Sequence, residues 1–186
     1  MSEEMLIRYC APTLAGIKTA SLFTCPSDPK EELRAQIRSA NRQLLPRGIR
    51  LLPLRQQSGR VLIYMYRPKR LERDLASQKA EAILARAHYP AGDPQRRLAE
   101  LSLRLRQFYE FPHEIGLFLG YPPDDVEGFI ENRARAFKCP GYWKVYGDEE
   151  KAKAQFRAIS TCTACYCRCY IHGMSLEKLA VREKAS

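Results

Sequence analysis

Short apolar runs and helix-like periodicities alternate along the chain. Residues 20–24, 49–54 and 60–66 are apolar, β-branched or aromatic runs that predict strands. A loop that contains glycine joins the second run to the third, so these two runs predict a β-hairpin. Pro53 lies in the second run and lacks the N–H that a central strand needs, so we expect an edge position or a bulge there.

Helical periodicity, in which apolar residues recur every three or four positions, marks most of the remaining chain. Helices are predicted over residues 29–45, 68–88, 94–109, 124–136 and 148–172. Pro12 and Gly16 predict a single short helical turn within residues 1–19. Residues 142–146 predict a further strand, and Ser175 predicts the start of a last helical turn.

Together these elements predict an α+β fold, in which a small, mostly antiparallel sheet of about four strands carries several packed helices. The length of 186 residues and the hydrophobic content of 45% suit one globular domain over residues 1–186. This composition excludes collagen-like, low-complexity and wholly disordered chains. The sequence shows neither a repeat nor a long linker that would indicate a second domain.

The N-terminus and the cysteine content predict a cytoplasmic protein. The chain starts with acidic residues and lacks the apolar run of a signal peptide. No segment approaches the ~20 apolar residues of a membrane span, so we expect no membrane partner. The seven cysteines are an odd number, which favours free thiols in a reducing compartment over a disulfide framework.

The formal charge of +10 is unevenly distributed. Residues 29–60 contain eight basic and two acidic residues, whereas residues 111–132 contain five acidic residues and no basic one. On the helix predicted in the basic segment, Arg34, Arg38 and Arg42 recur every four positions and form one exposed stripe. Together with the arginines that follow it, this stripe is the best candidate for an RNA or DNA interface, and a solvated basic face is the alternative. The arginines that follow are Arg47, Arg50, Arg55 and Arg60.

Four cysteines lie close together near the C-terminus: Cys162, Cys165, Cys167 and Cys169. Thiolates bind zinc, iron–sulfur centres and other soft metals. Helical spacing places Cys162, Cys165 and Cys169 on one face and Cys167 elsewhere, so a metal site here needs a further ligand from another segment. Thiol redox chemistry and the packing of small apolar side chains are the alternatives.

His113 and Glu114 lie in the acidic segment and are candidate catalytic residues. A histidine beside a carboxylate can act as a general base or as a metal ligand. Cys10 is a candidate nucleophile if the fold brings it to His113, because a thiol needs a base or a cation to become a thiolate. Alternatively, His113 and Glu114 fill the first turn of a helix and Cys10 belongs to the core.

Thr13, Lys18 and Ser21 are candidate ligand-binding residues around a turn. Hydroxyls, a glycine and a lysine that lie close together can hold a phosphate or a carboxylate. The segment is not a P-loop, because it lacks the GxxxxGK[ST] pattern. A tight turn with a solvated Lys18 is the alternative.

Stiff turns rich in proline and glycine carry Tyr121, Trp143 and Lys144, which are further candidate ligand-binding residues. Rigid aromatic loops form good walls for a planar ligand such as a flavin, a haem or a nucleobase. Such rings also fill small cores, which is the alternative for Trp143. Asp124 is expected to cap the helix that begins there.

Three motifs resemble those of one known family. They are CAPTLAGIKTASLF at residues 10–23, FPHEIGLFLGYPPDDVEGFI at residues 111–130 and KCPGYWKVYGD at residues 138–148. In this order they resemble the bacterial domain-of-unknown-function 3793 family over nearly the whole chain. The resemblance implies a cytosolic protein of anaerobic and related bacteria, and it assigns no activity and no catalytic residue.

The sequence therefore predicts a protein that binds a small ligand or a metal, and a thiol-dependent or redox-related enzyme is one form of this hypothesis. The pocket would combine the turn at residues 10–21, the segment at His113 and the loop at residues 139–146. Cys10 would be the thiol, His113 the base or ligand, and Lys18 the partner of an anion. Zinc, iron or a planar cofactor of the flavin or haem type fits this expectation. The alternative is a non-enzymatic nucleic-acid-binding module.

Overall fold

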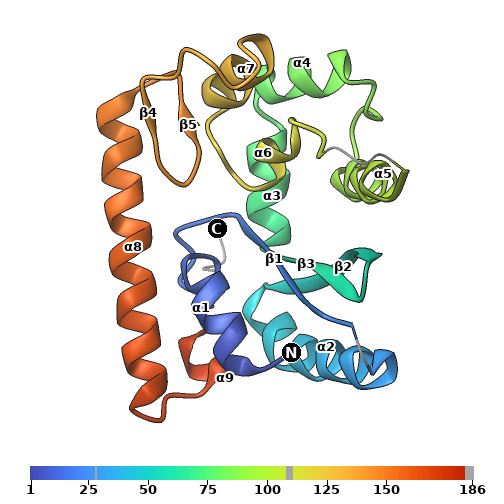
Figure 1. Cartoon of the computed structure of the whole chain (residues 1–186), viewed down its shortest axis with the longest axis vertical. Coiled ribbons are helices and arrows are strands. Elements are labelled where there is room, and N and C mark those ends of the chain that lie inside the picture. Colours follow the sequence, from blue (N-terminus) through green and yellow to red (C-terminus); the bar gives the residue numbers. More distant parts are fainter. Residues whose placement is uncertain (28, 108–110, 183–186) are drawn as a thin grey trace. The chain divides into compact units, whose positions relative to one another are not determined.

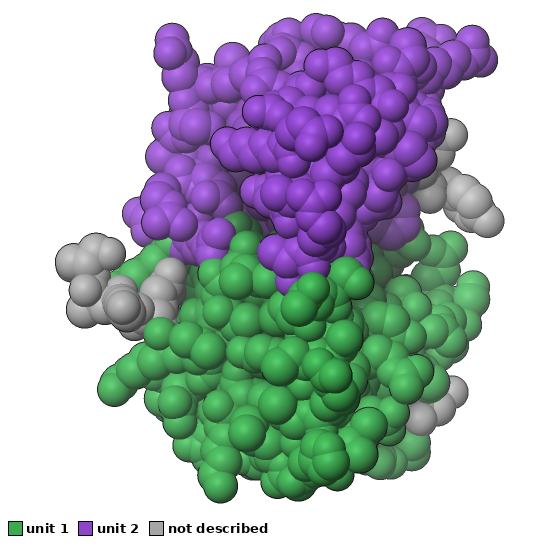
Figure 2. Space-filling view, turned by 90° about the vertical axis from the view of Figure 1, so that its left-hand side faces the viewer, with its two compact units in different colours: residues 1–69, 159–186 green, residues 70–158 purple. Residues whose placement is uncertain are grey.

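The computed structural model describes residues 1–27, 29–107 and 111–182. It has the α+β architecture that the sequence predicts. The chain divides into two compact units, which Figure 2 shows in different colours. Unit 1 comprises residues 1–69 and 159–186, and unit 2 comprises residues 70–158. Unit 1 is thus built from two separate stretches of the chain, and unit 2 from the stretch between them.

Unit 1 contains an antiparallel sheet. Its strands are β1 (Ala20–Pro26), β2 (Arg50–Gln57) and β3 (Arg60–Tyr66), in the order β1-β3-β2 (Figure 1). β2 and β3 form the predicted hairpin, and β3 is the central strand. The register of β2 against β3 shifts between Pro53 and Arg55. Pro53 therefore lies at an irregularity on an edge strand, which confirms the prediction from its missing N–H.

Helices and the sheet bury a common core in unit 1. The helices are α1 (Glu3–Leu14), α2 (Lys30–Leu44) and α9 (Leu176–Leu179), and the short 3₁₀ helix η1 (Leu45–Arg47) follows α2. Core side chains come from all three α-helices and all three strands and include Leu6, Ile7, Leu14, Phe23, Ile37, Leu44, Leu51, Ile63, Met65, Leu176 and Leu179. The period of the apolar residues in α2 thus sets which face this helix buries, whereas the continuous apolar run of β3 is buried on both faces.

α1 is much longer than the single turn predicted within residues 1–19. The Ser2 side chain caps its N-terminus by accepting a hydrogen bond from the Met5 N–H, and acidic residues fill its first turn. Pro12 lies inside the last turn of this helix instead of starting a new one. Burial of the apolar face of α1 outweighs the local signal of Pro12, because tertiary packing supplies most of the stability of a helix.

Unit 2 is built mainly from helices. Its elements are α3 (Pro68–Leu75), α4 (Gln78–Arg86), α5 (Pro94–Gln107), α6 (Ile115–Phe118), α7 (Pro123–Glu131), β4 (Cys139–Pro140), β5 (Lys144–Val145) and the first part of α8 (Glu149–Ile171) (Figure 1). The first two residues of α3 and the last part of α8 belong to unit 1. α8 confirms the long helix predicted over residues 148–172.

Several element boundaries differ from the predicted ones for local reasons. The helix predicted over residues 68–88 is two helices, because Ser77 caps a separate helix by accepting a hydrogen bond from the Ala80 N–H. The helix predicted over residues 124–136 ends at Glu131. Left-handed backbone follows it at Arg133, Ala134 and Ala136. For the helix predicted over residues 94–109, positions 108 and 109 lie outside the described residues.

The strand predicted over residues 142–146 is only two residues long and pairs with β4 in a short antiparallel ladder. The described residues therefore contain a three-stranded sheet and a separate two-stranded pair, where the sequence predicts one sheet of about four strands. None of the helices in the described ranges is long and apolar enough to span a membrane.

Candidate functional site

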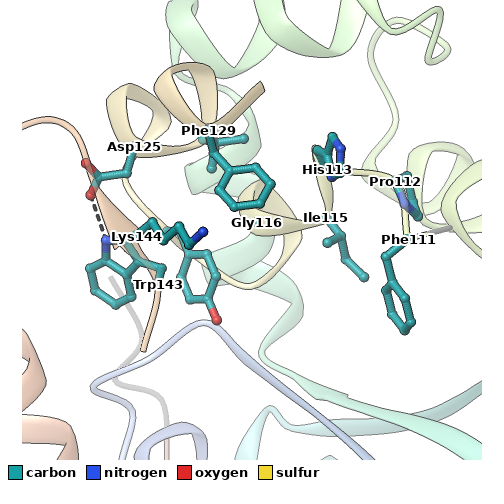
Figure 3. Close-up of a pocket in the computed structure, with 11 residues that line it drawn as sticks. Phe111, Pro112, His113, Ile115, Gly116, Asp125, Phe129, Trp143 and Lys144 are labelled. Carbon is teal, nitrogen blue, oxygen red and sulfur yellow. Dashed lines mark hydrogen bonds between the residues drawn. The ribbon is translucent and has the colours of Figure 1, made fainter. Parts of the chain in front are cut away.

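A pocket of about 230 Å³ opens in unit 2 and has a largely aromatic wall. Figure 3 shows Phe111 and His113 at one end, Asp125 and Trp143 at the other, and Phe129 between them. The other lining residues are Pro112, Ile115, Gly116, Tyr121, Val126 and Lys144. The three aromatic-loop residues predicted to bind a ligand thus line the same pocket as the candidate catalytic histidine.

Asp125 fixes one end of this pocket. Only 3% of Asp125 is exposed. Its Oδ2 accepts a hydrogen bond from the indole Nε1 of Trp143 at 2.6 Å, and its Oδ1 accepts from the backbone N–H groups of Tyr146 and Gly147, both at 2.7 Å. A buried carboxylate is stable when donors satisfy its oxygens in this way. Asp125 therefore holds the indole in one orientation and ties α7 to the segment around β5.

Aromatic contacts hold Trp143 from two further directions. The Tyr121 ring stacks on the indole with centroids 4.8 Å apart, and the Phe156 ring contacts the indole edge-on at 4.5 Å. Gly141 permits this approach of Phe156, because a Cβ at position 141 would lie 2.0 Å from the Phe156 ring. The Tyr121 hydroxyl donates to the Tyr142 carbonyl oxygen at 3.3 Å, and burial raises the pKa of this hydroxyl. Trp143 is therefore a rigid wall of the pocket.

Lys144 and His113 are the basic side chains of the pocket. The Lys144 ammonium donates to the Ala134 carbonyl oxygen at 2.8 Å and lies 5.8 Å from the centroid of the Phe129 ring. The His113 ring contacts the same Phe129 ring edge-on, with centroids 5.1 Å apart. A ligand placed against Phe129 therefore meets basic groups from two separate segments of unit 2 (Figure 3).

Glu114 belongs to an ion-pair network in unit 2. Its carboxylate is 3.3 Å from the Arg104 guanidinium, which also pairs with Glu100 at 2.7 Å and lies 4.1 Å from the centroid of the Tyr89 ring. Only 8% of Glu114 is exposed. These contacts favour the structural alternative for Glu114, because its carboxylate is engaged by a cation while His113 contacts an aromatic ring. Joint catalysis by His113 and Glu114 stays a prediction.

Cys10 lies in unit 1 and His113 in unit 2, so neither unit contains both members of the predicted pair. Cys10 is fully buried in α1, and this burial raises the pKa of its thiol far above the usual range. A protonated, buried thiol is the state expected of a core residue. The surroundings of Cys10 therefore favour packing, and its role as a nucleophile stays a prediction.

The turn that carries Thr13, Lys18 and Ser21 also lies in unit 1. The Thr13 and Ser21 hydroxyls are buried and form a hydrogen bond of 2.8 Å with each other. Burial lowers the pKa of Lys18 to about 8, and the neighbouring Cys10 acts in the opposite direction. The hydroxyls satisfy each other, which favours a structural turn. Ligand binding by these three residues stays a prediction.

The cysteines near the end of α8 occupy different environments. Cys165 is exposed, whereas Cys162, Cys167 and Cys169 are half-buried, and the last two pack against the core of unit 1. Burial raises the pKa of the Cys162 thiol to about 11. Within residues 1–27, 29–107 and 111–182, no three His, Cys, Asp or Glu side chains gather so that they could hold a metal ion. Metal binding by these four cysteines stays a prediction.

The arginine stripe lies on α2. Arg34, Arg38 and Arg42 are all exposed, as their spacing predicts. Arg34 pairs with Glu31 at 2.9 Å, so the stripe is interrupted by at least one carboxylate. Nucleic-acid binding by these three arginines stays a prediction.

A family model described as "Protein of unknown function (DUF3793)" matches residues 6–180. The chain belongs to the DUF3793 family. No curated protein and no solved structure matches it. In this DUF3793 protein, two of the motifs that carry the resemblance, at residues 111–130 and 138–148, supply every residue that lines the pocket of unit 2. The motif at residues 10–23 lies in unit 1.

Asp125 and Phe129 are among the pocket residues of this DUF3793 protein that the sequence analysis does not name as candidates. Asp124, the expected cap of α7, instead pairs with Lys79, and Pro122 occupies the cap position. A signal was nevertheless available. Adjacent helical residues point in different directions, and Asp125 precedes the apolar Phe129 by four residues on the same face.

Proposed function

We propose that the pocket of unit 2 binds a small planar molecule, and that the protein is a cytoplasmic binding protein for it. The single observation behind this proposal is an aromatic pocket whose Trp143 wall is held by the buried Asp125. A ring that is already fixed loses little conformational entropy when a ligand stacks on it, so such a pocket favours binding. The seven free cysteines support the proposed compartment.

The volume of the pocket limits the size of the ligand. A volume of about 230 Å³ is below the roughly 300–1,000 Å³ of sites for drug-sized ligands and above the roughly 150 Å³ cavity that holds one benzene. A substituted single ring or a fused pair of rings, such as a nucleobase, therefore suits the pocket better than a haem macrocycle.

The basic side chains favour a ligand that carries a negative charge or a hydrogen-bond acceptor. Lys144 and His113 contribute to the wall, whereas the carboxylate of Asp125 is already satisfied by its own donors. A charge-assisted hydrogen bond from Lys144 would orient the ring of the ligand against Phe129. We therefore expect an aromatic carboxylate to bind more tightly than its neutral amide.

Tryptophan fluorescence tests the proposal directly, because Trp143 is the only tryptophan of the chain. Titration with benzoate, or with adenine as a fused-ring probe, should change the Trp143 emission to saturation. Two matched compounds separate the contributions of ring and charge. Cyclohexanecarboxylate keeps the charge of benzoate without the flat ring, and benzamide keeps the ring without the charge. Each should bind at least about fivefold more weakly than benzoate.

A pair of lysine variants supplies the matched control. Lys144→Met should weaken benzoate binding about tenfold and leave benzamide binding unchanged. Lys138→Met should change neither, because Lys138 is exposed, donates to the Gly147 carbonyl oxygen and does not line the pocket. The proposal is wrong if neither benzoate nor adenine gives a saturable change, or if cyclohexanecarboxylate binds as tightly as benzoate.

A further inference from the structure

Unit 1 contains a second concave site, with a volume of about 340 Å³. Four basic side chains line it: Arg47, Arg50, Lys69 and Arg182. The first two belong to the basic segment at residues 29–60, whereas Lys69 follows that segment and Arg182 comes from near the end of the given sequence. The charge of the site therefore arises from the fold and cannot be read from one stretch of sequence.

The sheet and one glycine turn bring the first cations together. Gly48 adopts a left-handed φ of 75° after η1, which turns the chain between Arg47 and Arg50. Arg50 is the first residue of β2 and lies opposite Tyr66, the last residue of β3. Lys69 follows Tyr66 by three residues and so emerges at the same end of the sheet as Arg50.

A buried guanidinium fixes the segment that carries the last cation. Arg67 is 2% exposed and donates to the carbonyl oxygens of Thr13 at 2.8 Å, Leu14 at 2.8 Å and Val181 at 2.7 Å. The Val181 N–H in turn donates to the Leu14 carbonyl oxygen at 3.0 Å. Arg182 is the next residue, so these hydrogen bonds hold its backbone beside the site.

The positive charges of the site are only partly compensated within the described part of the chain. Arg47 pairs with Glu177 at 3.4 Å, and the Glu177 side chain remains 60% exposed. Arg50, Lys69 and Arg182 form no ion pair with any described residue. Like charges that converge on a concave surface repel one another and focus the electrostatic field, so a bound anion lowers the free energy of the site.

We infer that this site binds a small phosphorylated molecule through its phosphate oxygens. Arginine donates two parallel hydrogen bonds to a phosphate, and lysine adds a compact positive charge. The converging cations suit a compact anion, whereas a nucleic-acid strand is bound by cations that follow its backbone. The site lies entirely in unit 1, so it does not depend on the ligand proposed for unit 2.

Calorimetric titration with pyrophosphate at constant ionic strength tests the inference. Pyrophosphate should bind saturably at about one equivalent, and inorganic phosphate should bind more weakly because it offers fewer oxygens. The double variant Arg50→Gln/Lys69→Gln should bind pyrophosphate at least about tenfold more weakly. The matched control is Arg38→Gln/Arg42→Gln, which removes the same charge from α2 and should bind like the wild type.

Three results would overturn the inference. They are an absence of saturable pyrophosphate binding, equal weakening in both double variants, and tighter binding of an RNA of about ten nucleotides that the α2 variant weakens. The last result would assign the basic surface to nucleic acid. All four substituted side chains are exposed, so circular dichroism and thermal unfolding should show that both variants keep the fold.

Discussion

Asp125 and Trp143 are 18 residues apart in the sequence, and the indole Nε1 of Trp143 donates a 2.6 Å hydrogen bond to the Asp125 carboxylate. Both residues line the pocket of unit 2. The orientation of the aromatic wall therefore depends on one buried carboxylate that also binds two backbone N–H groups. Pocket shape and local stability are set by the same residue, so a substitution there should change both.

Asp125→Asn should destabilise the protein by about 2–4 kcal/mol, because the amide replaces an acceptor by a donor and leaves buried N–H groups unsatisfied. The Trp143 emission of the folded variant should shift to longer wavelength as the indole loosens. Asp124→Asn is the matched control, since this neighbour is 65% exposed and its ion pair with Lys79 is worth less than about 1 kcal/mol. Denaturant unfolding of both variants measures the difference, and equal losses would contradict a special role for Asp125.

Gly141→Ala should destabilise unit 2 by about 1–3 kcal/mol, because its methyl group would overlap the Phe156 ring. A double-mutant cycle with Phe156→Ala tests this cause. In the Phe156→Ala background the ring is absent, so Gly141→Ala should cost at least about 1 kcal/mol less than in the wild type. Additive effects of the two substitutions would show that some other contact makes glycine necessary.

Lys18→Met should stabilise unit 1 at neutral pH. Burial lowers the pKa of Lys18 to about 8 from 10.5, so the unfolded chain binds more protons than the folded protein between these values. The free energy of unfolding therefore rises with pH across this window. Below about pH 8, Lys18 is charged in both states, and its destabilising effect on the folded protein is greatest. Because Lys18 is partly exposed, we expect a gain on the order of 1–2 kcal/mol at pH 7, which should vanish near pH 10.5.

The comparison of Lys18→Met with the wild type must be made at each pH, because Cys10 has the opposite effect. Burial raises the pKa of the Cys10 thiol above 9.0, so its contribution to the stability of unit 1 declines as the pH rises above that value. This contribution is present in both proteins and largely cancels in the difference of their unfolding free energies. A difference that does not vary between pH 7 and 10.5 would contradict the lowered pKa of Lys18.

Native thiol labelling should distinguish the cysteines by their surroundings. Iodoacetamide should modify the exposed Cys165 first, and the buried Cys10 and Cys25 at least about a hundredfold more slowly. Peptide mass spectrometry after timed quenching gives the order, and labelling in denaturant shows that every cysteine can react. Rapid native labelling of Cys10 would contradict its burial and support the hypothesis that it is a nucleophile.

Arg67→Met should destabilise unit 1 by about 3 kcal/mol, because three carbonyl oxygens lose a charged donor. Hydrogen exchange should increase most in the segment of residues 176–181, which Arg67 holds through Val181. Arg60→Met is the control, since Arg60 is exposed and donates only to Thr24 within the described hydrogen bonds. Similar hydrogen exchange of residues 176–181 in the two variants would show that apolar contacts alone hold this segment.

The sequence predicts well those elements whose pattern of residues is long and depends only on neighbouring positions. α2, α8 and the β2–β3 hairpin have a clear apolar period or a glycine turn, and nothing distant overrides it. α1 is the opposite case, since its Pro12 suggests a boundary that burial of the helix face removes. The strand predicted at residues 142–146 is shorter for two reasons. Residues 142 and 143 lie in the turn between β4 and β5, and Asp125 accepts the N–H of Tyr146, which follows β5.

The residues of the pocket divide in a similar way. Tyr121, Trp143 and Lys144 can be predicted because they are aromatic or basic side chains in turns rich in proline and glycine. The fold brings them together with His113. Asp125 escapes because its partners are an indole and two backbone groups more than 15 positions away. The spacing of residues predicts helical faces and metal-ligand patterns. It does not predict which distant backbone groups a buried carboxylate will bind.

The two-part construction of unit 1 also sets an order of events during synthesis. The core around its sheet includes Leu176, Leu179 and Ala180, yet the ribosome must first translate all of unit 2, residues 70–158. At about 5–20 residues per second that interval lasts on the order of 5–20 s. During it, α1 and α2 lack their packing partner α9, and the apolar side chains that α9 covers are accessible to chaperones. The segment that is made first is therefore among the last to complete its packing.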